Sequence, residues 1–167
     1  AWSETLLKLT QQGYQVALTS DYYDYAPFTR MKSLGLDNTR GDDQKPYDGK
    51  VDYDVWVTID SNMIFSPKHV IDLIEDTDKY PVVSGVHRMP VQVEYTTMGF
   101  MACKKGVIET LTYPYFNYPV KVCEVDGKSI THIFPDDASF CKRLTDAGHK
   151  IMINTDIFVG NEKRLII

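Results

Sequence analysis

The chain has 167 residues, of which 43% are hydrophobic and 25% charged, and its net charge is −5 at neutral pH. This size and composition predict a single globular domain over residues 1–167 with a hydrophobic core of its own. The acidic balance and the scattered basic residues exclude a typical nucleic-acid binder, and no apolar run reaches the about 18 residues that a membrane span needs.

A helix is predicted at the start of the chain, where apolar residues recur at helical spacing before Gly13. Residues 14–19 (YQVALT) have the composition of a short strand. A second helix is predicted to begin at Pro27, a residue that suits the first helical turn, and to end near Gly35. Residues 36–53 are polar and turn-rich, which predicts a long loop.

Residues 54–59 (DVWVTI) form a continuous apolar run, typical of a strand in a sheet that is covered on both faces. A helix is predicted after it from Ser66-Pro67, since serine is a good N-cap and proline a good first helical residue. Further strands are predicted over residues 81–86 (PVVSGV) and 98–103 (MGFMAC).

The last third of the chain predicts a short helix over residues 105–111 and then a hairpin. Two strand-like runs, 120–125 and 128–132, flank Asp126-Gly127, a dipeptide that favours a tight hairpin turn. A helix from Asp136 or Asp137 to Gly148 and a final strand over 150–153 complete the chain.

Helices alternate with strands, which predicts an α/β three-layer sandwich with a mainly parallel central sheet and a small inserted hairpin. Ligands of such sheets bind beyond the carboxyl ends of the strands. The residues that follow the apolar strand 54–59, Asp60-Ser61-Asn62, are therefore the first candidate site.

Asp60 and Asn62 lie two residues apart, so in an extended stretch both side chains project to the same side. Their oxygens suit Mg²⁺ or Mn²⁺, and such an ion can bridge the phosphates of a nucleotide diphosphate. The alternative interpretation is that Asp60 and Ser61 only begin a turn. The pattern Asp-x-Asn does not decide between the two.

Two longer stretches give these residues a context. Residues 53–75 (YDVWVTIDSNMIFSPKHVIDLIE) resemble the central strand, metal motif and following helix of GT-A-fold glycosyltransferases, most closely the inverting family-2 type and its viral and environmental relatives. Residues 135–163 (PDDASFCKRLTDAGHKIMINTDIFVGNEK) are similar to the acidic helix and the downstream metal-ligand segment of the same family. The resemblance covers about residues 14–163 and implies binding of a nucleotide-diphosphate sugar and glycosyl transfer to an acceptor hydroxyl.

The resemblance also implies roles for individual residues. Asp60 would face the ribose or an Mn²⁺ or Mg²⁺ ion, and Asn62 and Asn161 stand where the family has an aspartate and a histidine ligand. Asparagine carries no charge, so ion affinity should fall. Three outcomes stay open: weak metal binding, function without metal, or binding without catalysis.

By the same resemblance, Asp137 is the candidate catalytic base, which would take the proton from the acceptor hydroxyl, and Asp136 would orient the acceptor or the helix end. The alternative is that either acid, or both, only caps the helix, because aspartate is a favoured N-cap and its charge suits a helix N-terminus. The second functional interpretation is a catalytically inactive nucleotide- or sugar-binding relative that has lost metal ligands, or an incomplete domain that needs a partner chain.

The remaining candidates for nucleotide-sugar binding are placed by their positions at strand ends or on neighbouring helices. The tyrosines around Tyr25 suit stacking on a base or sugar, or ordinary packing, and Lys45 reaches the phosphates if the long loop folds over the site. The candidates are Asp21, Arg30, Ser61 and Arg88.

The first strand of the resembled family has no counterpart ahead of the opening helix, which predicts an N-terminally truncated domain with unpaired sheet edges. Pairing with a second copy of the chain, giving a homodimer, would cover such an edge. The three cysteines, Cys103, Cys123 and Cys141, form no CxxC pair. Together with the lack of a signal peptide, they predict a cytoplasmic protein.

Overall fold

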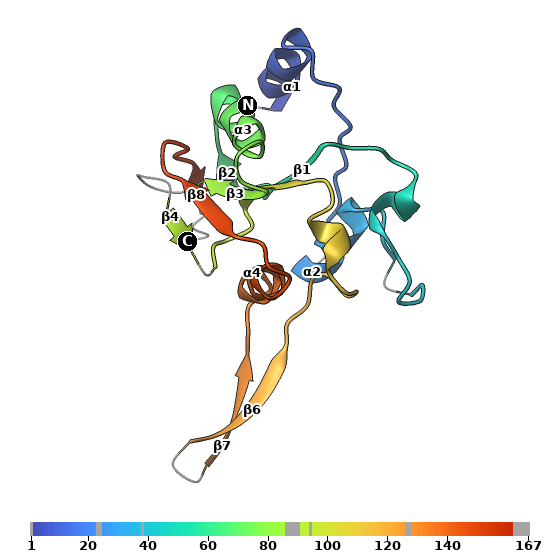
Figure 1. Ribbon diagram of the computed structural model, residues 1–167, viewed down its shortest axis with the longest axis vertical. Coiled ribbons are helices and arrows are strands. Elements are labelled where there is room, and N and C mark those ends of the chain that lie inside the picture. Colours follow the sequence, from blue (N-terminus) through green and yellow to red (C-terminus); the bar gives the residue numbers. More distant parts are fainter. Residues whose placement is uncertain are drawn as a thin grey trace, which may run out of the picture.

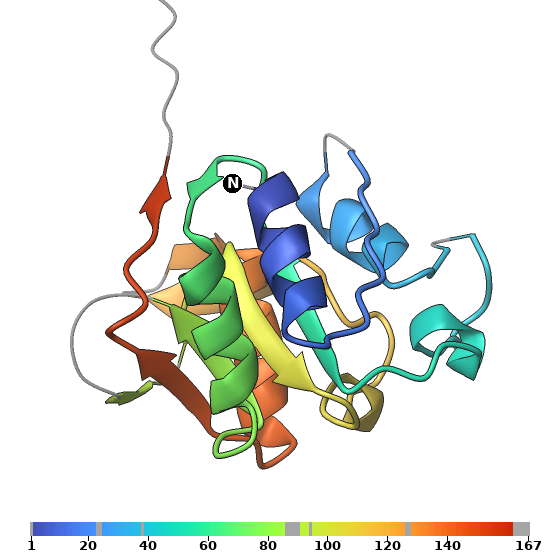
Figure 2. The ribbon, with the colours of Figure 1, turned by 90° about the horizontal axis from the view of Figure 1, so that it is seen from above.

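The computed structural model describes residues 2–22, 25–37, 39–85, 91–93, 95–125 and 128–161. A central sheet carries helices on both faces, and a long two-stranded hairpin projects from one end of the molecule (Figures 1 and 2).

The central sheet has five strands in the order β1-β5-β3-β8-β4. It is mixed, because only β3 and β8 run parallel, whereas β1/β5, β3/β5 and β4/β8 are antiparallel. The prediction of a mainly parallel sheet was therefore wrong. Apolar patterning fixes which faces of a strand are buried but not the direction in which the strand enters the sheet. The strands are β1 (Val55–Ile59), β3 (Val82–Gly85), β4 (Val91–Val93), β5 (Phe100–Lys104) and β8 (Ile151–Asn154).

Two helices cover each face of this sheet. One layer contains α1 (Trp2–Gln11) and α3 (Pro67–Asp76), which lie side by side in Figure 2. The other contains α2 (Ala26–Ser33) and α4 (Asp136–Asp146). Alternate residues of β5 reach opposite layers: Phe100 and Ala102 pack with the first, and Met101 and Cys103 with the second. The three-layer α/β arrangement itself was predicted correctly.

The predicted helix boundaries are confirmed by local chemistry. Ser66 begins α3 with a capping box, in which the Ser66 side chain accepts from the third helical residue and the Ser66 N–H donates to His69 Nδ1. The helix before Gly13 and the helix from Pro27 also lie near the expected positions, as α1 and α2. The predicted helix over 105–111 is reduced to a short 3₁₀ turn, η2 (Ile108–Thr110).

Residues 14–19 do not form the predicted strand, because no described strand pairs with them. Their side chains are mostly exposed, including those of Val16 and Leu18. The neighbouring prediction needs a related correction. The apolar run 54–59 does form β1, but β1 is an edge strand in which only Trp56 is fully buried.

The predicted hairpin is confirmed as β6 (Val120–Val125) and β7 (Lys128–Ile133). It projects below α4 and α2 in Figure 1. Smaller elements complete the described chain: the 3₁₀ turn η1 (Pro46–Gly49) and the two short strands β2 (Met63–Ile64) and β9 (Gly160–Asn161), which pair with each other. Within the described residues, no helix is both long and apolar enough to cross a bilayer.

Candidate active site

Three carboxylates meet at one guanidinium, that of Arg30. Arg30 Nη1 lies 3.1 Å from Asp60 Oδ1, Nε lies 3.1 Å from Asp136 Oδ2, and Nη2 lies 3.5 Å from Asp137 Oδ1. Asp60 is 30 residues and Asp136 106 residues away from Arg30 in the chain. Four residues that were singled out in the sequence thus share one place, which we call the Arg30 cluster (Arg30, Asp60, Asp136 and Asp137).

Three elements, α2, β1 and α4, place the four members of the Arg30 cluster. Arg30 lies on α2, on the side that packs against the sheet, and Asp60 follows the last residue of β1. Asp136 and Asp137 are the first two residues of α4, immediately after the hairpin returns to the body. The cluster therefore joins the carboxyl end of β1 to the layer formed by α2 and α4.

Burial makes this cluster unlike a surface ion pair. The Arg30 and Asp136 side chains are each 10% exposed, whereas those of Asp137 and Asp60 are 27% and 44% exposed. Burial lowers the pKa of Arg30, but the charges of Asp60, Asp136 and Asp137 and the hydrogen bond to Asp136 together raise that pKa above its ordinary value. Arg30 is therefore a permanent cation that holds the three acids in place.

Asp137 has the chemistry that a general base needs. Burial raises the pKa of Asp137, and the charge of Asp136 raises it further, while Arg30 and a hydrogen bond from the Met98 N–H act in the opposite direction. The net result is a pKa above the usual aspartate value. A carboxylate with a raised pKa binds a proton more readily, and it remains partly open to solvent here.

The turn at Met98 and Gly99 was missed by sequence reasoning. The Met98 N–H lies 3.3 Å from Asp137 Oδ1, and the Asp60 N–H donates to the Gly99 carbonyl over 2.9 Å. A Cβ added at Gly99 would lie 3.2 Å from Asp60 Oδ2, which is tighter than ordinary contact. The only signal in the sequence was the glycine at the start of the 98–103 run.

The other predicted residues are less closely connected to the cluster. Ser61 and Asp21 are exposed, and within the described part of the chain neither makes a hydrogen bond or ion pair with the cluster. Asn161 lies opposite Met63 in the β2/β9 pair, one residue from Asn62, but its side chain is outside the described residues. Arg88 lies wholly outside them.

The described residues do not form a protein cage for a metal ion. Among them, no group of three or more His, Cys, Asp or Glu side chains is arranged to hold one. Asp60 nevertheless fits a hard cation that is shared with a ligand: its Oδ1 faces Arg30, and its Oδ2 accepts no hydrogen bond within the described chain. Mg²⁺ is often held in this way, by one or two carboxylates together with substrate phosphates.

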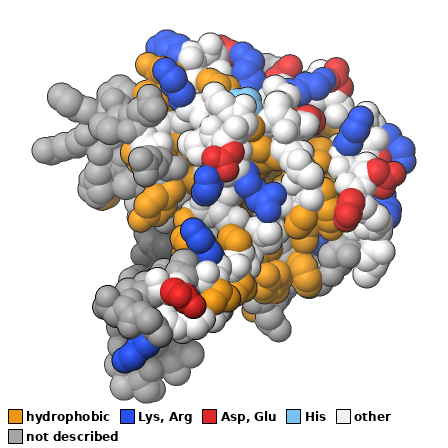
Figure 3. Space-filling model, turned by 60° about the horizontal axis from the view of Figure 1, so that its bottom comes forward, with side chains coloured by type: hydrophobic (Ala, Val, Ile, Leu, Met, Phe, Trp, Pro, Cys, Tyr) orange, Lys and Arg blue, Asp and Glu red, His pale blue; other side chains and the backbone are white. Residues whose placement is uncertain are grey.

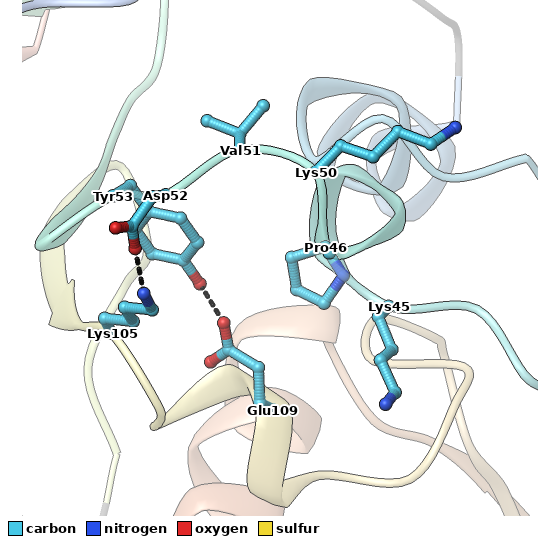
Figure 4. Close-up of a pocket in the computed structure, with 9 residues that line it drawn as sticks. Lys45, Pro46, Lys50, Val51, Asp52, Tyr53, Lys105 and Glu109 are labelled. Carbon is cyan, nitrogen blue, oxygen red and sulfur yellow. Dashed lines mark hydrogen bonds and ion pairs between the residues drawn. The ribbon is translucent and has the colours of Figure 1, made fainter.

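The cavity in Figure 4 lies elsewhere. It has a volume of about 310 Å³, and none of the Arg30 cluster residues lines it. In Figure 4 its walls carry two polar contacts, Lys105 with Asp52 and the Tyr53 hydroxyl with Glu109. Lys45, which was expected to reach the phosphates if the long loop folds over the site, lines this cavity.

Comparison with known proteins gives a fold relationship. No protein-family model and no curated protein matches the chain. A solved structure, the crystal structure of A197 from STIV, is similar with a TM-score of 0.57 over 96% of this chain and 80% of that chain, at 13% sequence identity. At that identity the similarity concerns the fold alone.

Proposed function

We propose that this chain binds a nucleotide-diphosphate sugar at the Arg30 cluster and transfers the glycosyl group to an acceptor hydroxyl. The observation that carries the proposal is the meeting of Asp60, Asp136 and Asp137 at one buried arginine. The resemblance of residues 53–75 and 135–163 to family-2 glycosyltransferases implies roles for the same three acids.

In the proposed reaction, Asp137 accepts the proton of the acceptor hydroxyl while the hydroxyl oxygen attacks the anomeric carbon of the donor. The bond between that carbon and the diphosphate oxygen breaks, and the nucleotide diphosphate leaves with the bonding electron pair. The raised pKa of Asp137 supports this role, because a base whose pKa lies closer to the working pH takes up the proton more readily. Asp136 and Arg30 hold Asp137 in position.

The charge of the cluster sets a requirement for the donor. Three carboxylates face one guanidinium, so the cluster carries a formal net charge of −2. Each of the Arg30 nitrogens Nε, Nη1 and Nη2 already contacts one of these carboxylates. A diphosphate would be repelled unless a further cation accompanies it. A divalent ion held by Asp60 and the two phosphates would supply that charge and stabilise the leaving group. Nucleotide binding should therefore depend on Mg²⁺ or Mn²⁺.

The second candidate function is nucleotide-sugar binding without turnover. Asn62 in place of an aspartate favours it, because the uncharged amide weakens an ion site. The two candidates share the binding site and differ only in the fate of the donor.

Calorimetry with UDP, GDP and their sugars, with and without Mg²⁺, tests the shared part of the proposal. We expect one nucleotide to bind only with the ion, and Asp60→Asn to weaken that binding by about tenfold or more. Asp146→Asn is the matched control, because Asp146 lies at the far end of α4 in an exposed pair with Lys142. Release of nucleotide diphosphate from the bound sugar donor then separates transferase from binding module.

A further inference from the structure

Two tyrosines form an aromatic wall beside the Arg30 cluster. The rings of Tyr25 and Tyr118 meet edge to face with their centroids 5.1 Å apart. The ring of Phe28 also packs edge to face against Tyr25, with the centroids 4.6 Å apart. Tyr25 is 38% exposed, and Tyr118 is half-buried. We call this pair the tyrosine wall (Tyr25 and Tyr118).

Hydrogen bonds of the two residues that flank Tyr118 hold it against the start of α4. On one side the Ser139 hydroxyl donates to Asn117 Oδ1 over 2.8 Å, and on the other the Phe134 N–H donates to the Pro119 carbonyl over 3.0 Å. Ser139 lies in the first turn of α4, and Phe134 lies two residues before Asp136. Tyr118 is therefore fixed next to the two acids that begin this helix.

Tyr25 is tied to the same place through α2. It is the N-cap residue of α2, and Arg30 on that helix binds Asp136. Burial raises the pKa of Tyr118, and the charges of Asp136, of Tyr25 and of Asp137 raise it further, which agrees with a phenol close to these acids. The tyrosine wall and the Arg30 cluster thus form adjoining parts of one surface.

This surface combines the two features by which proteins hold a sugar ring. Aromatic faces pack against the apolar C–H face of the ring, and nearby carboxylates and amides accept or donate hydrogen bonds to its hydroxyls. Asn117 supplies an amide there, and Asp137 supplies a carboxylate that is partly open to solvent. The net charge of −2 on the cluster disfavours an anionic sugar and leaves a neutral one as the best fit.

We propose that the tyrosine wall is the acceptor subsite, and that it binds a neutral sugar whose hydroxyl points at Asp137. This inference rests on the proposed transferase function and adds the class of acceptor. Figure 3 shows hydrophobic side chains gathered where the hairpin meets the body. Val120 and Ile133, which pair at this end of the hairpin, and Phe134 are exposed.

Saturation-transfer NMR with small glycosides tests the subsite. The probes are the methyl glycosides of glucose, galactose, mannose and N-acetylglucosamine, with methyl glucuronide as the anionic counterpart, each in the presence of UDP or GDP and Mg²⁺. We expect at least one neutral glycoside to receive saturation on its ring protons, and the glucuronide to receive none. The signal should fall at least fivefold in Tyr25→Ala and Tyr118→Ala and persist in Tyr25→Phe and Tyr118→Phe, which keep the rings.

Tyr25 is the more exposed of the two, so its alanine variant keeps the test decisive if Tyr118→Ala does not fold. A nucleotide signal without any glycoside signal, or a glycoside signal that is unchanged in Tyr25→Ala, would overturn the acceptor subsite and leave the proposed function standing. Absence of both nucleotide and glycoside signals would overturn the proposed function as well.

Discussion

The Arg30 cluster and the cavity of Figure 4 differ in how far their charged side chains are exposed to solvent. In the cluster, Arg30 and Asp136 are both 10% exposed and belong to helices of the packed body. At the cavity, Lys105 and Asp52 are 50% and 90% exposed, and both lie outside the helices and the central sheet. Charges that are buried despite the cost of desolvation need an explanation, whereas exposed pairs of this kind are common on any surface. This contrast is why we place the proposed chemistry at the buried charges of the Arg30 cluster and not at the cavity.

The largest effect should come from removing the cluster's cation. Arg30→Met leaves Asp136 buried next to two other carboxylates, and breaking a buried ion pair in this way costs about 3–5 kcal/mol. Urea denaturation monitored by circular dichroism should show that loss in the free energy of unfolding at pH 7. A loss below about 1 kcal/mol would mean that the cluster is no more than a surface feature.

Asp137→Asn should separate catalysis from stability. We expect donor turnover to fall by about 10²-fold or more, since an amide cannot take the acceptor proton. Stability should not fall at neutral pH, because a raised pKa means that the folded state disfavours the ionised Asp137. Protonated Asp137 contributes to the stability of the wild-type protein at low pH. That contribution is lost as pH rises from the ordinary aspartate pKa of about 3.9 through the raised pKa, whereas the asparagine variant has no such group to titrate.

The unfolding free energies of the wild type and of Asp137→Asn, measured across pH 3–7, show whether ionised Asp137 stabilises or destabilises the fold. The stability of the variant relative to wild type should grow with pH over that window. A relative stability that falls with rising pH would show that ionised Asp137 stabilises the fold, contrary to its burial beside Asp136.

Gly99→Ala should have a smaller effect, confined to Asp60. The added methyl group would lie 3.2 Å from Asp60 Oδ2, so the carboxylate must shift by a few tenths of an ångström. We expect Mg²⁺-dependent nucleotide binding to weaken by about tenfold, or about 1.4 kcal/mol. Calorimetry on Gly99→Ala measures this, and unchanged affinity would remove Asp60 Oδ2 from the proposed ion site.

The smallest effect should come from the cavity. Lys105→Ala removes an exposed pair with Asp52 and should change stability by no more than about 1 kcal/mol. Nucleotide affinity should stay at the wild-type value. A large loss of nucleotide binding in this variant would move the functional site from the Arg30 cluster to the cavity.

Much of the local structure could be predicted from the sequence, because local signals specify it. Ser66-Pro67 predicted the start of α3, and Asp126-Gly127 predicted the hairpin, since caps and tight turns depend on a few adjacent residues. The mixed sheet could not be predicted, because the direction of β5 depends on pairing with strands far away in the sequence. The expected strand at 14–19 failed for the same reason: its composition suits a strand, but no described strand pairs with it.

The acidic residues of the candidate site could be predicted from the sequence, but the central role of Arg30 could not. Asp60 was singled out because it follows an apolar strand, and Asp137 because of the resemblance to family-2 glycosyltransferases. Arg30 was named only as one candidate for nucleotide-sugar binding, yet it binds all three acids. Contacts across 30 and 106 residues leave no local pattern in the sequence. The role of Gly99 is visible only when Asp60 is seen against it.

The central claim is that the Arg30 cluster binds a nucleotide diphosphate together with a divalent ion. A crystal structure with UDP or GDP and Mn²⁺, using the anomalous signal of manganese, tests it most directly. We predict one Mn²⁺ peak in contact with the Asp60 carboxylate and with both phosphates, while Arg30 keeps its contacts with Asp136 and Asp137. Nucleotide bound in the cavity beside Lys45 and Lys105, or an Mn²⁺ peak away from Asp60, would contradict the account.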